Sequence, residues 1–119
     1  MFWSRLTMRS PFLSALHRVE VTQKDLLLRI LQENEQTEFG KEYGFAGISS
    51  VQEFRKRIPI CDYNTLEPYI KRQQEGNSEL TAADPVFYAR SSGTTGRYKD
   101  IPMTKSGVNQ IKRFQKQLA

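Results

Sequence analysis

Apolar residues recur at helical spacing between residues 14 and 34, and the pattern fits two helix boundaries. In the first, one helix runs from about Ser14 through Asn34 and is weakest at Val19–Val21. In the second, a helix begins after Thr22, which caps it. In both, the apolar face is formed by Leu27, Ile30 and Leu31 and is broadened by Leu26 and Leu28. The first part of the chain is therefore expected to be helical.

Glycines punctuate the region that follows. The polar stretch Glu33–Thr37 ends the helical pattern, and Gly40 and Gly44 come soon after it. We expect a loop here, held against the core by aromatic side chains rather than used for stacking on a cofactor. These side chains are Phe39, Tyr43 and Phe45.

A capping box marks the start of a short helix in the middle of the chain. Ser50 and Glu53 have the spacing of that motif, and Pro59 stops the helix. Residues 58–60 should be extended, because proline disfavours helical backbone in the residue before it. The apolar residues at helical spacing are Val51, Phe54 and Ile58.

A second helix is predicted directly afterwards. Either Asp62 or Asn64 caps it, Pro68 falls in its first turn, and Gly76 closes it. Its apolar side is formed by Leu66, Tyr69 and Ile70.

The last third of the chain predicts a hairpin and one more helix. Val86–Ala89 has the composition of a strand, and Tyr98–Met103 is a candidate for its partner, which would place the intervening segment at a hairpin tip. Thr104 caps the final helix. We expect the apolar residues of that helix to face inward, namely Val108, Ile111, Phe114 and Leu118.

The overall composition limits the classes of function. The 119 residues leave room for one small domain or a piece of a larger one, and the net charge is +5. No basic run is interleaved with stacking aromatics, so a nucleic-acid platform is not expected. Cys61 is the only cysteine and His17 the only histidine. An internal disulfide is therefore impossible, and we expect Cys61 to be a buried structural thiol rather than part of a metal site or a nucleophilic pair.

Residues 1–19 contain three arginines and no acidic residue, which is faintly similar to a mitochondrial transit peptide. Arg5, Arg9, Ser10 and Pro11 interrupt every apolar run, so neither a secretory signal nor a membrane span is expected. We interpret residues 1–13 as an N-terminal arm of a cytoplasmic protein that does not bind membranes.

The segment Ser91–Lys99 carries the candidate chemistry. It contains six small residues in a row, four of them hydroxylated, and ends in a lysine. Gly93 and Gly96 can adopt positive φ and let a ligand approach the main chain. Backbone N–H groups, hydroxyls and the ammonium group of Lys99 would together suit an anion such as a polyphosphate. The hydroxyl groups belong to Ser91, Ser92, Thr94 and Thr95.

The spacing of the glycines distinguishes this loop from other phosphate loops. Only Thr94 and Thr95 separate Gly93 from Gly96, whereas a Walker A loop has four residues between its glycines, followed by Lys and Ser or Thr. The G-x-G-x-x-G fingerprint of dinucleotide-binding folds is also absent. The pattern that remains resembles the first nucleotide-binding motif of the adenylate-forming superfamily. A flexible Ser/Thr/Gly linker is the alternative.

Stretches upstream and downstream of the loop narrow this resemblance. In order and spacing, residues 20–119 resemble the N-terminus of the auxin-responsive promoter family of acyl-acid amido synthetases, with a loop spacing more similar to bacterial relatives. The stretches that carry the resemblance are Leu27–Leu31 with Asn34, Thr37–Gly40, Gly44-Phe45, Phe54, Pro59-Ile60, Asp62-Tyr63, Pro68–Ile70, Ser91–Gly96 and Ile101–Thr104.

The resemblance implies an α/β fold in which an N-terminal helical portion leads into the first strands of a luciferase-like large domain. Residues 14–119 would be an incomplete part of the adenylating domain, with the rest of its own chain as a partner. The implied activity is ATP- and Mg²⁺-dependent adenylation of a carboxylic acid, followed by acyl transfer to an amine such as an amino acid. By motif position, Ser91, Ser92, Gly93, Thr94, Thr95 and Gly96 would hold the phosphates, with Lys99 as a weaker contact.

Two other functions fit the same loop. One is an acyl-CoA ligase, in which the acyl group passes to a thiol. The other is a non-enzymatic module that has kept only nucleotide binding or interaction. The catalytic residues and the identities of the acid and the acceptor cannot be assigned from these residues, and the chain by itself is not expected to complete catalysis.

Overall fold

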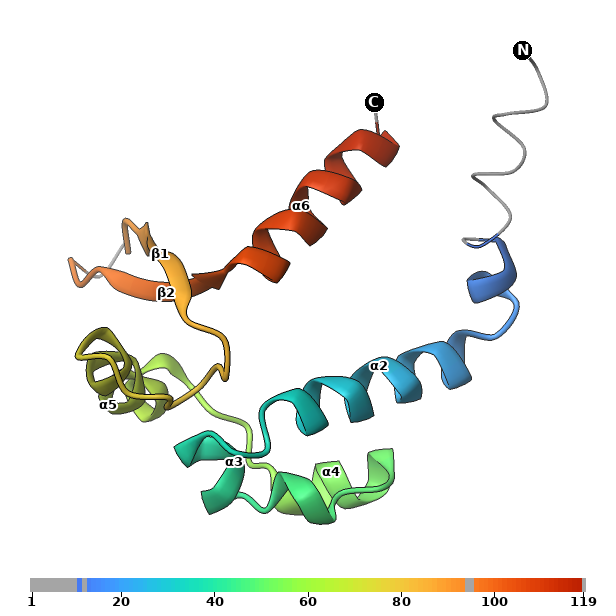
Figure 1. The fold of residues 1–119 in the computed structure, drawn as a ribbon, viewed down its shortest axis with the longest axis horizontal. Helices are drawn as coiled ribbons and strands as arrows, with labels where there is room; N and C mark the ends of the chain where they lie inside the picture. The colour runs from blue at the N-terminus through green and yellow to red at the C-terminus, as the bar shows by residue number, and fades with distance from the viewer. Residues whose placement is uncertain (1–10, 12, 94–95, 119) are drawn as a thin grey trace.

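Residues 11, 13–93 and 96–118 are described by a computed structural model, in which helices lead into a hairpin and a last helix (Figure 1). The elements are α2 (Val19–Glu33), α3 (Glu38–Glu42), the 3-10 turn η1 (Phe45–Gly47), α4 (Val51–Arg57), α5 (Tyr63–Gln74), β1 (Pro85–Ser91), β2 (Lys99–Thr104) and α6 (Lys105–Leu118). The described residues thus form a mixed α/β structure, mostly helical with one two-stranded sheet. Thr94, Thr95 and nearly all of the expected arm, residues 1–13, lie outside the described residues.

α2 begins where neither of the predicted boundaries placed it. A turn at His17-Arg18 interrupts the helical backbone, and α2 starts at Val19 with Arg18 as a cap residue that makes no side-chain hydrogen bond. Thr22 is not the cap, because its N–H already donates to the carbonyl of Arg18 at 2.9 Å, as in a continuing helix. The expected weak point is real, but it lies just before Val19.

The predicted loop after α2 contains a short helix, α3. Thr37 is fully buried, and its hydroxyl donates to the carbonyl of Asn34 at 2.7 Å while accepting from the N–H of Gly40 at 2.9 Å. A Cβ on Gly40 would lie 2.1 Å from the Asn34 carbonyl oxygen, so only glycine fits at this corner. The polar stretch that ends α2 therefore also caps the next helix.

Phe39 is the centre of the aromatic cluster that holds this corner. Its ring lies 4.3 Å from Tyr43, 5.9 Å from Phe45 and 5.2 Å from Tyr69, measured between centroids. The role predicted for these aromatics is confirmed. Among the described residues, the buried apolar side chains are Leu31, Phe39, Ile48 and Ile70.

The capping box at the start of α4 is present in a shifted form. The hydroxyl of Ser50 accepts from the N–H of Glu53 at 3.1 Å, and the Glu53 carboxylate accepts from the N–H of Ser49 at 2.7 Å instead of from that of Ser50. The Glu53 carboxylate also accepts from the hydroxyl of Ser49 at 2.9 Å, and the two bonds from Ser49 lower the pKa of Glu53. The helix ends at Arg57, before Pro59, as predicted.

The cap and the end of α5 are as predicted, but its proline lies beyond the first turn, where it was expected. Asp62 caps the helix, accepting from the N–H of Thr65 at 2.9 Å. Pro68 is consequently the sixth residue, in the second turn, where its missing N–H leaves the carbonyl of Asn64 without a helical partner. Gly76 adopts φ +97° just past the helix, and its N–H donates to the carbonyl of Gln73 at 3.1 Å.

Cys61 is half-buried, which corrects the expectation of a buried thiol. It lies in the extended connection between α4 and α5, next to Ile60, whose side chain is fully exposed. Its thiol donates to the carbonyl of Pro59 at 3.4 Å. A short extended connection of this kind presents its side chains to solvent on both sides, so a thiol within it is only partly covered.

Backbone and side-chain hydrogen bonds join the segment before β1 to the helices. The N–H of Phe39 donates to the carbonyl of Glu79 at 3.0 Å, and the N–H of Ala82 donates to the side chain of Asn34 at 3.0 Å. The buried amide of Gln73 accepts from the N–H of Leu80 at 3.0 Å. The start of the hairpin is therefore fixed relative to α2, α3 and α5.

β1 and β2 form the predicted antiparallel hairpin, with an irregularity between Pro85 and Phe87. α6 follows directly, and the hydroxyl of Thr104 accepts from the N–H of Gly107 at 3.2 Å, as a helix cap does. Figure 1 shows α6 running from the end of β2 away from α3, α4 and α5.

The inward orientation expected for the apolar face of α6 is wrong for two of its residues. Val108, near β2, is half-buried, but Ile111 is 48% and Phe114 is 61% exposed. The helical spacing of the apolar residues is real, but no element of the described chain covers Ile111 and Phe114. The expectation for the side chain of Leu118 lies outside what the structure describes.

Candidate functional site

The connection between β1 and β2 places the predicted loop at the end of the hairpin. Ser91 ends β1 and lies opposite Lys99, the first residue of β2. The N–H of Gly96 donates to the carbonyl of Gly93 at 3.2 Å, and Gly96 adopts φ +75°. A Cβ at Gly96 would meet no atom within 4 Å, so the glycine is required by the backbone conformation and borders open space.

The described residues of the predicted site gather at this end of the hairpin. Ser91 and Gly93 are half-buried, whereas Ser92, Gly96 and Lys99 are exposed. Thr94 and Thr95 complete the set by sequence but lie outside the described residues. Hydroxyl, amide and ammonium donors are thus close together and accessible.

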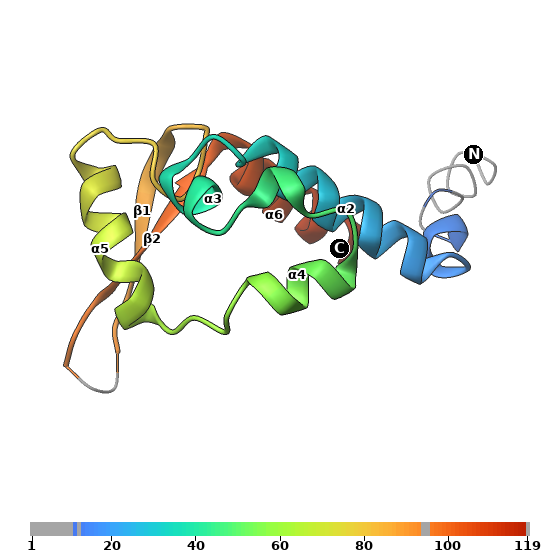
Figure 2. The same ribbon diagram turned by 90° about the horizontal axis from the view of Figure 1, so that it is seen from below.

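The first turn of α5 contacts the outgoing strand of the hairpin through Tyr63. The N–H of Asp100 donates to the Tyr63 hydroxyl at 2.9 Å, and the ammonium of Lys99 lies 5.7 Å from the centroid of the Tyr63 ring. Figure 2 shows the ends of the two strands extending past the first turn of α5. One aromatic residue therefore touches both of the first two residues of β2.

An ion pair crosses the hairpin next to the loop. Arg90 contacts the Asp100 carboxylate through Nε at 2.8 Å and Nη2 at 3.1 Å, and the amide of Gln74 donates to the same carboxylate at 3.3 Å. These contacts, that of Arg90 above all, lower the pKa of Asp100. The guanidinium also lies 5.5 Å from the centroid of the Tyr98 ring. The strand residues beside the loop are held to each other and to α5.

A hollow of about 220 Å³ separates the start of α5 from the hairpin. The hairpin contributes Arg97 and Lys99, two cations, and the helix contributes Asp62, whose pKa is lowered by the N–H of Thr65 that it caps. The other lining residues are Tyr63, Asn64, Glu67 and Tyr98. Because Asp62 is engaged in capping and Glu67 pairs with Lys71 at 3.1 Å, the cations of the hairpin are the groups available to an anion.

Sequence reasoning missed Tyr63, Arg90 and Asp100 as parts of this site. Arg90 directly precedes Ser91, and Asp100 directly follows Lys99, so opposite charges flank the loop at matched positions. In a hairpin, such positions face each other across the strands, so the sequence alone would have predicted the ion pair between Arg90 and Asp100. No comparable signal identified Tyr63, which is 37 residues from Asp100 in the chain.

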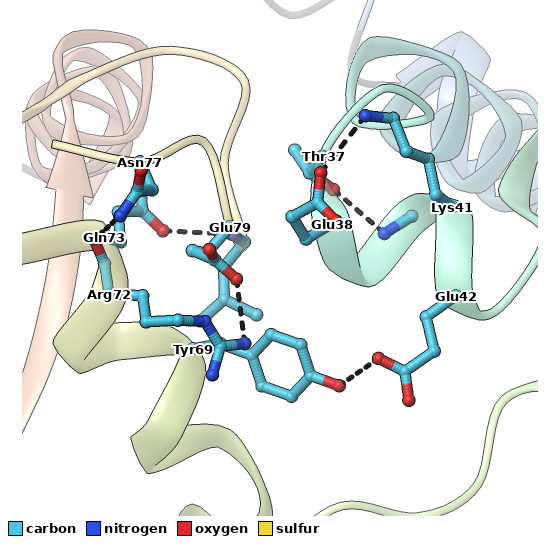
Figure 3. Close-up of polar contacts among 11 residues, drawn as sticks. Thr37, Glu38, Lys41, Glu42, Tyr69, Arg72, Gln73, Asn77 and Glu79 are labelled. Carbon is cyan, nitrogen blue, oxygen red and sulfur yellow. Dashed lines mark hydrogen bonds and ion pairs between the residues drawn. The ribbon is translucent and has the colours of Figure 1, made fainter.

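A second hollow, of about 720 Å³, lies between α3, α5 and the segment after α5. Figure 3 shows its charged residues pointing at one another: Arg72 contacts the buried Glu79 at 2.9 Å, and the hydroxyl of Tyr69 donates to Glu42. The bond to Glu42 raises the pKa of Tyr69 to about 12, so the phenol stays protonated. Because these groups satisfy one another, we interpret this second hollow as part of the framework.

Neither a cluster of metal-ligating side chains nor a membrane-crossing helix is found in the part of the chain that the structure describes. Residues 11, 13–93 and 96–118 contain no group of three or more His, Cys, Asp or Glu side chains placed to hold a metal ion. None of the helices in these ranges combines the length and apolar character needed to cross a bilayer.

Comparison with known proteins places the sequence of this chain in a family. Residues 9–119 match the GH3 family N-terminal domain. The chain is 40% identical over 95 residues to the probable indole-3-acetic acid-amido synthetase GH3.12 of Oryza sativa subsp. japonica, covering 77% of this chain and 16% of that protein. It is 37% identical over 83 residues to the jasmonoyl-L-amino acid synthetase JAR6 of Nicotiana attenuata, covering 67% of this chain and 14% of that protein. The chain thus spans about a sixth of the length of these relatives.

Proposed function

Because this chain belongs to the GH3 family, we propose that the protein is an ATP-dependent ligase that joins a carboxylic acid to an amine. In the proposed reaction, the acid is activated as an acyl-adenylate with release of pyrophosphate, and an amine such as an amino acid then displaces the adenylate to form an amide. Relatives named as amido and amino acid synthetases support an amine acceptor. The observation that carries the proposal is the run of small, hydroxylated residues at the hairpin end, of which Ser92 and Gly96 are exposed.

The loop has the properties that a phosphate site requires. Gly96 borders open space, Ser92 is exposed, and Lys99 and Arg97 add positive charge at the same end of the hairpin. Donors that are already oriented stabilise charge as it develops on phosphate oxygens in the transition state. We assign phosphate binding to Ser91, Ser92, Gly93, Thr94, Thr95 and Gly96, with Lys99 as a weaker contact.

Mg²⁺ is proposed to accompany ATP, where it would neutralise part of the phosphate charge. The described residues offer no cluster of ligating side chains for it. Because Mg²⁺ usually binds substrate phosphates directly, we propose that the metal is held mainly through the nucleotide, while hydroxyl and ammonium groups of the loop contact the phosphate oxygens.

The assignment of the loop is tested by acid-dependent exchange of pyrophosphate into ATP, measured on protein expressed from the complete coding sequence. Thr94→Ala and Thr95→Ala should each slow exchange about 10²–10³-fold, the usual effect of losing one transition-state donor. Gly93→Val should do more, because a β-branched side chain would occupy the phosphate space. Lys99→Ala should do less.

Thr22→Ala, on the exposed surface of α2, is the matched control and should exchange at the parent rate. Folded Thr94, Thr95 and Gly93 variants that also exchange at the parent rate would contradict phosphate binding by the loop.

The identity of the acceptor is tested separately. Amides should form from the activated acid and a mixture of amino acids, whereas coenzyme A in place of the amino acids should give no thioester. Thioester formation without amide formation would identify the protein as an acyl-CoA ligase instead.

A further inference from the structure

We infer that Tyr63 and Asp100 are positioning residues that hold the phosphate loop in register with the first turn of α5. The inference rests on the proposed function, because it explains how a loop at the end of a two-stranded hairpin is fixed well enough to orient ATP. Groups that act on a substrate must be held to within about 0.5 Å by their neighbours. A hairpin of only two strands does not reach that rigidity by itself.

Tyr63 acts on both the backbone and the charge of β2. Its hydroxyl accepts from the N–H of Asp100 at 2.9 Å, a partly buried bond that joins the backbone of the outgoing strand to the helix. Its ring lies 5.7 Å from the ammonium of Lys99, a distance suited to a cation–π contact. The side chain thereby limits where Lys99 can point and keeps its charge beside the hollow of about 220 Å³.

Asp100 connects the same strand to the other side of the hairpin and to the far end of α5. Its carboxylate accepts from Arg90 at 2.8 Å and 3.1 Å and from Gln74, the last residue of α5, at 3.3 Å. An exposed ion pair alone contributes little, and the side chain of Arg90 is 61% exposed. The contacts to Tyr63 and Gln74 therefore distinguish this arrangement from an ordinary cross-strand pair, because they fix Asp100 to both ends of one helix.

These contacts predict separate roles for the two parts of the Tyr63 side chain. Tyr63→Phe removes the acceptor for Asp100 but keeps the ring beside Lys99, whereas Tyr63→Leu removes both. A loop that is correctly built but held less firmly should bind ATP more weakly while reacting normally once ATP is bound. The effect should therefore fall on KM for ATP rather than on kcat.

The test uses full-length protein and two measurements: KM and kcat for ATP in pyrophosphate exchange, and hydrogen exchange of peptides covering residues 98–104. Tyr63→Phe should raise KM for ATP about two- to tenfold, the range expected from one hydrogen bond, and should speed amide exchange in β2. Tyr63→Leu should raise KM further, and adding Lys99→Ala to it should change KM less than Lys99→Ala does in the parent protein.

Tyr69→Phe is the matched control, because it also removes a hydroxyl contact made by α5, but one to Glu42 of α3 rather than to the hairpin. It should leave KM for ATP and hydrogen exchange in β2 unchanged.

Unchanged hydrogen exchange of β2 in Tyr63→Phe would overturn the inference, whatever reaction the protein catalyses. If Tyr63→Phe speeds hydrogen exchange in β2 but leaves KM for ATP unaltered, the positioning role is contradicted. The proposed function still holds in that case, provided that the Thr94 and Thr95 variants are impaired in pyrophosphate exchange. If the Thr94 and Thr95 variants exchange pyrophosphate into ATP at the parent rate, the proposed function itself is contradicted.

Discussion

The helical part of the molecule, residues 31–82, contains the four buried apolar side chains of the described chain, whereas the hairpin and α6 contain none. Leu31, Phe39, Ile48 and Ile70 are buried in the first region. In the second region, Tyr88, Met103 and Val108 are half-buried, and six large apolar side chains are 48–65% exposed. These six residues are Val86, Phe87, Tyr98, Ile101, Ile111 and Phe114.

This difference explains where the proposed site obtains its order. The helical part is stabilised by apolar burial together with polar groups that satisfy one another, such as Thr37, Gln73 and Glu79. Among the described residues, the hairpin that carries the loop buries no large apolar side chain, and near the loop it is joined to α5 by the polar contacts of Asp100 with Tyr63 and Gln74. The position of the loop should therefore be sensitive to single hydrogen bonds, while the stability of the chain should be sensitive to buried methyl groups.

The largest effect should come from truncating a buried isoleucine in the helical part. Ile70 is 4% exposed, so Ile70→Ala should lower the free energy of unfolding by about 2–5 kcal/mol. Ile111→Ala in α6 makes the same chemical change at a site that is 48% exposed, and it should change stability by less than about 0.5 kcal/mol. Urea unfolding of the 119-residue chain, followed by circular dichroism, measures both. Equal losses would show that the two regions do not differ as described.

A smaller loss is expected at the buried threonine of the α2–α3 corner. Thr37→Val keeps the shape of the side chain but leaves the N–H of Gly40 without its acceptor, at a cost of about 1–3 kcal/mol. Thr65→Val is the control, because the hydroxyl of Thr65 also makes a hydrogen bond, to Asp62, but is exposed to water. If the two variants unfold at the same urea concentration, burial of the hydroxyl at Thr37 is not what matters.

The smallest expected effect is the contribution of two aspartates to the pH dependence of folding stability. The pKa of Asp62 is lowered mainly by the N–H of Thr65, and that of Asp100 mainly by Arg90. Because both folded-state pKa values lie below the unfolded ones, the stability that they contribute is complete above about pH 4 and is lost as the pH falls through the folded-state values.

The variant Asp62→Asn distinguishes the contribution of Asp62 as a helix cap from the contribution of its titrating carboxylate. Asparagine can still accept the N–H of Thr65, but it does not titrate, so the variant should show a shallower loss of stability as the pH falls below about 4. Urea midpoints at several pH values measure the slope. A slope in Asp62→Asn as steep as that of the parent would exclude Asp62 as a contributor.

Features with a local cause were predictable from the sequence. Asp62, Gly76 and Thr104 mark helix ends in the structure because caps act on backbone groups only a few residues away. The hairpin was likewise predictable from two apolar runs around a glycine-containing segment.

Features that depend on distant neighbours were not predictable. Helical spacing identified the apolar face of α6 but carried no information on whether another element covers it, and Ile111 and Phe114 are exposed. Cys61 was misjudged for the same reason. In the site, the loop was recognisable from its composition, but the contact of Tyr63 with Asp100 depends on how α5 packs against β2.

The most direct test of the central claim, that the loop at the hairpin end binds the phosphates of ATP, compares two glycines. Gly96 in the loop and Gly76 after α5 both have positive φ, +75° and +97°, and a Cβ at either position would meet no atom within 4 Å. Alanine at either position should strain the backbone by about 1–3 kcal/mol without a steric clash.

The measurement is acid-dependent pyrophosphate exchange at limiting ATP, made on full-length Gly96→Ala and Gly76→Ala proteins. Gly96→Ala should lower the exchange rate about tenfold or more, because backbone strain of about 1.4 kcal/mol then acts on the ATP site itself. Gly76→Ala should exchange at the parent rate. Equal rates for the two variants would contradict the claim that the loop binds ATP.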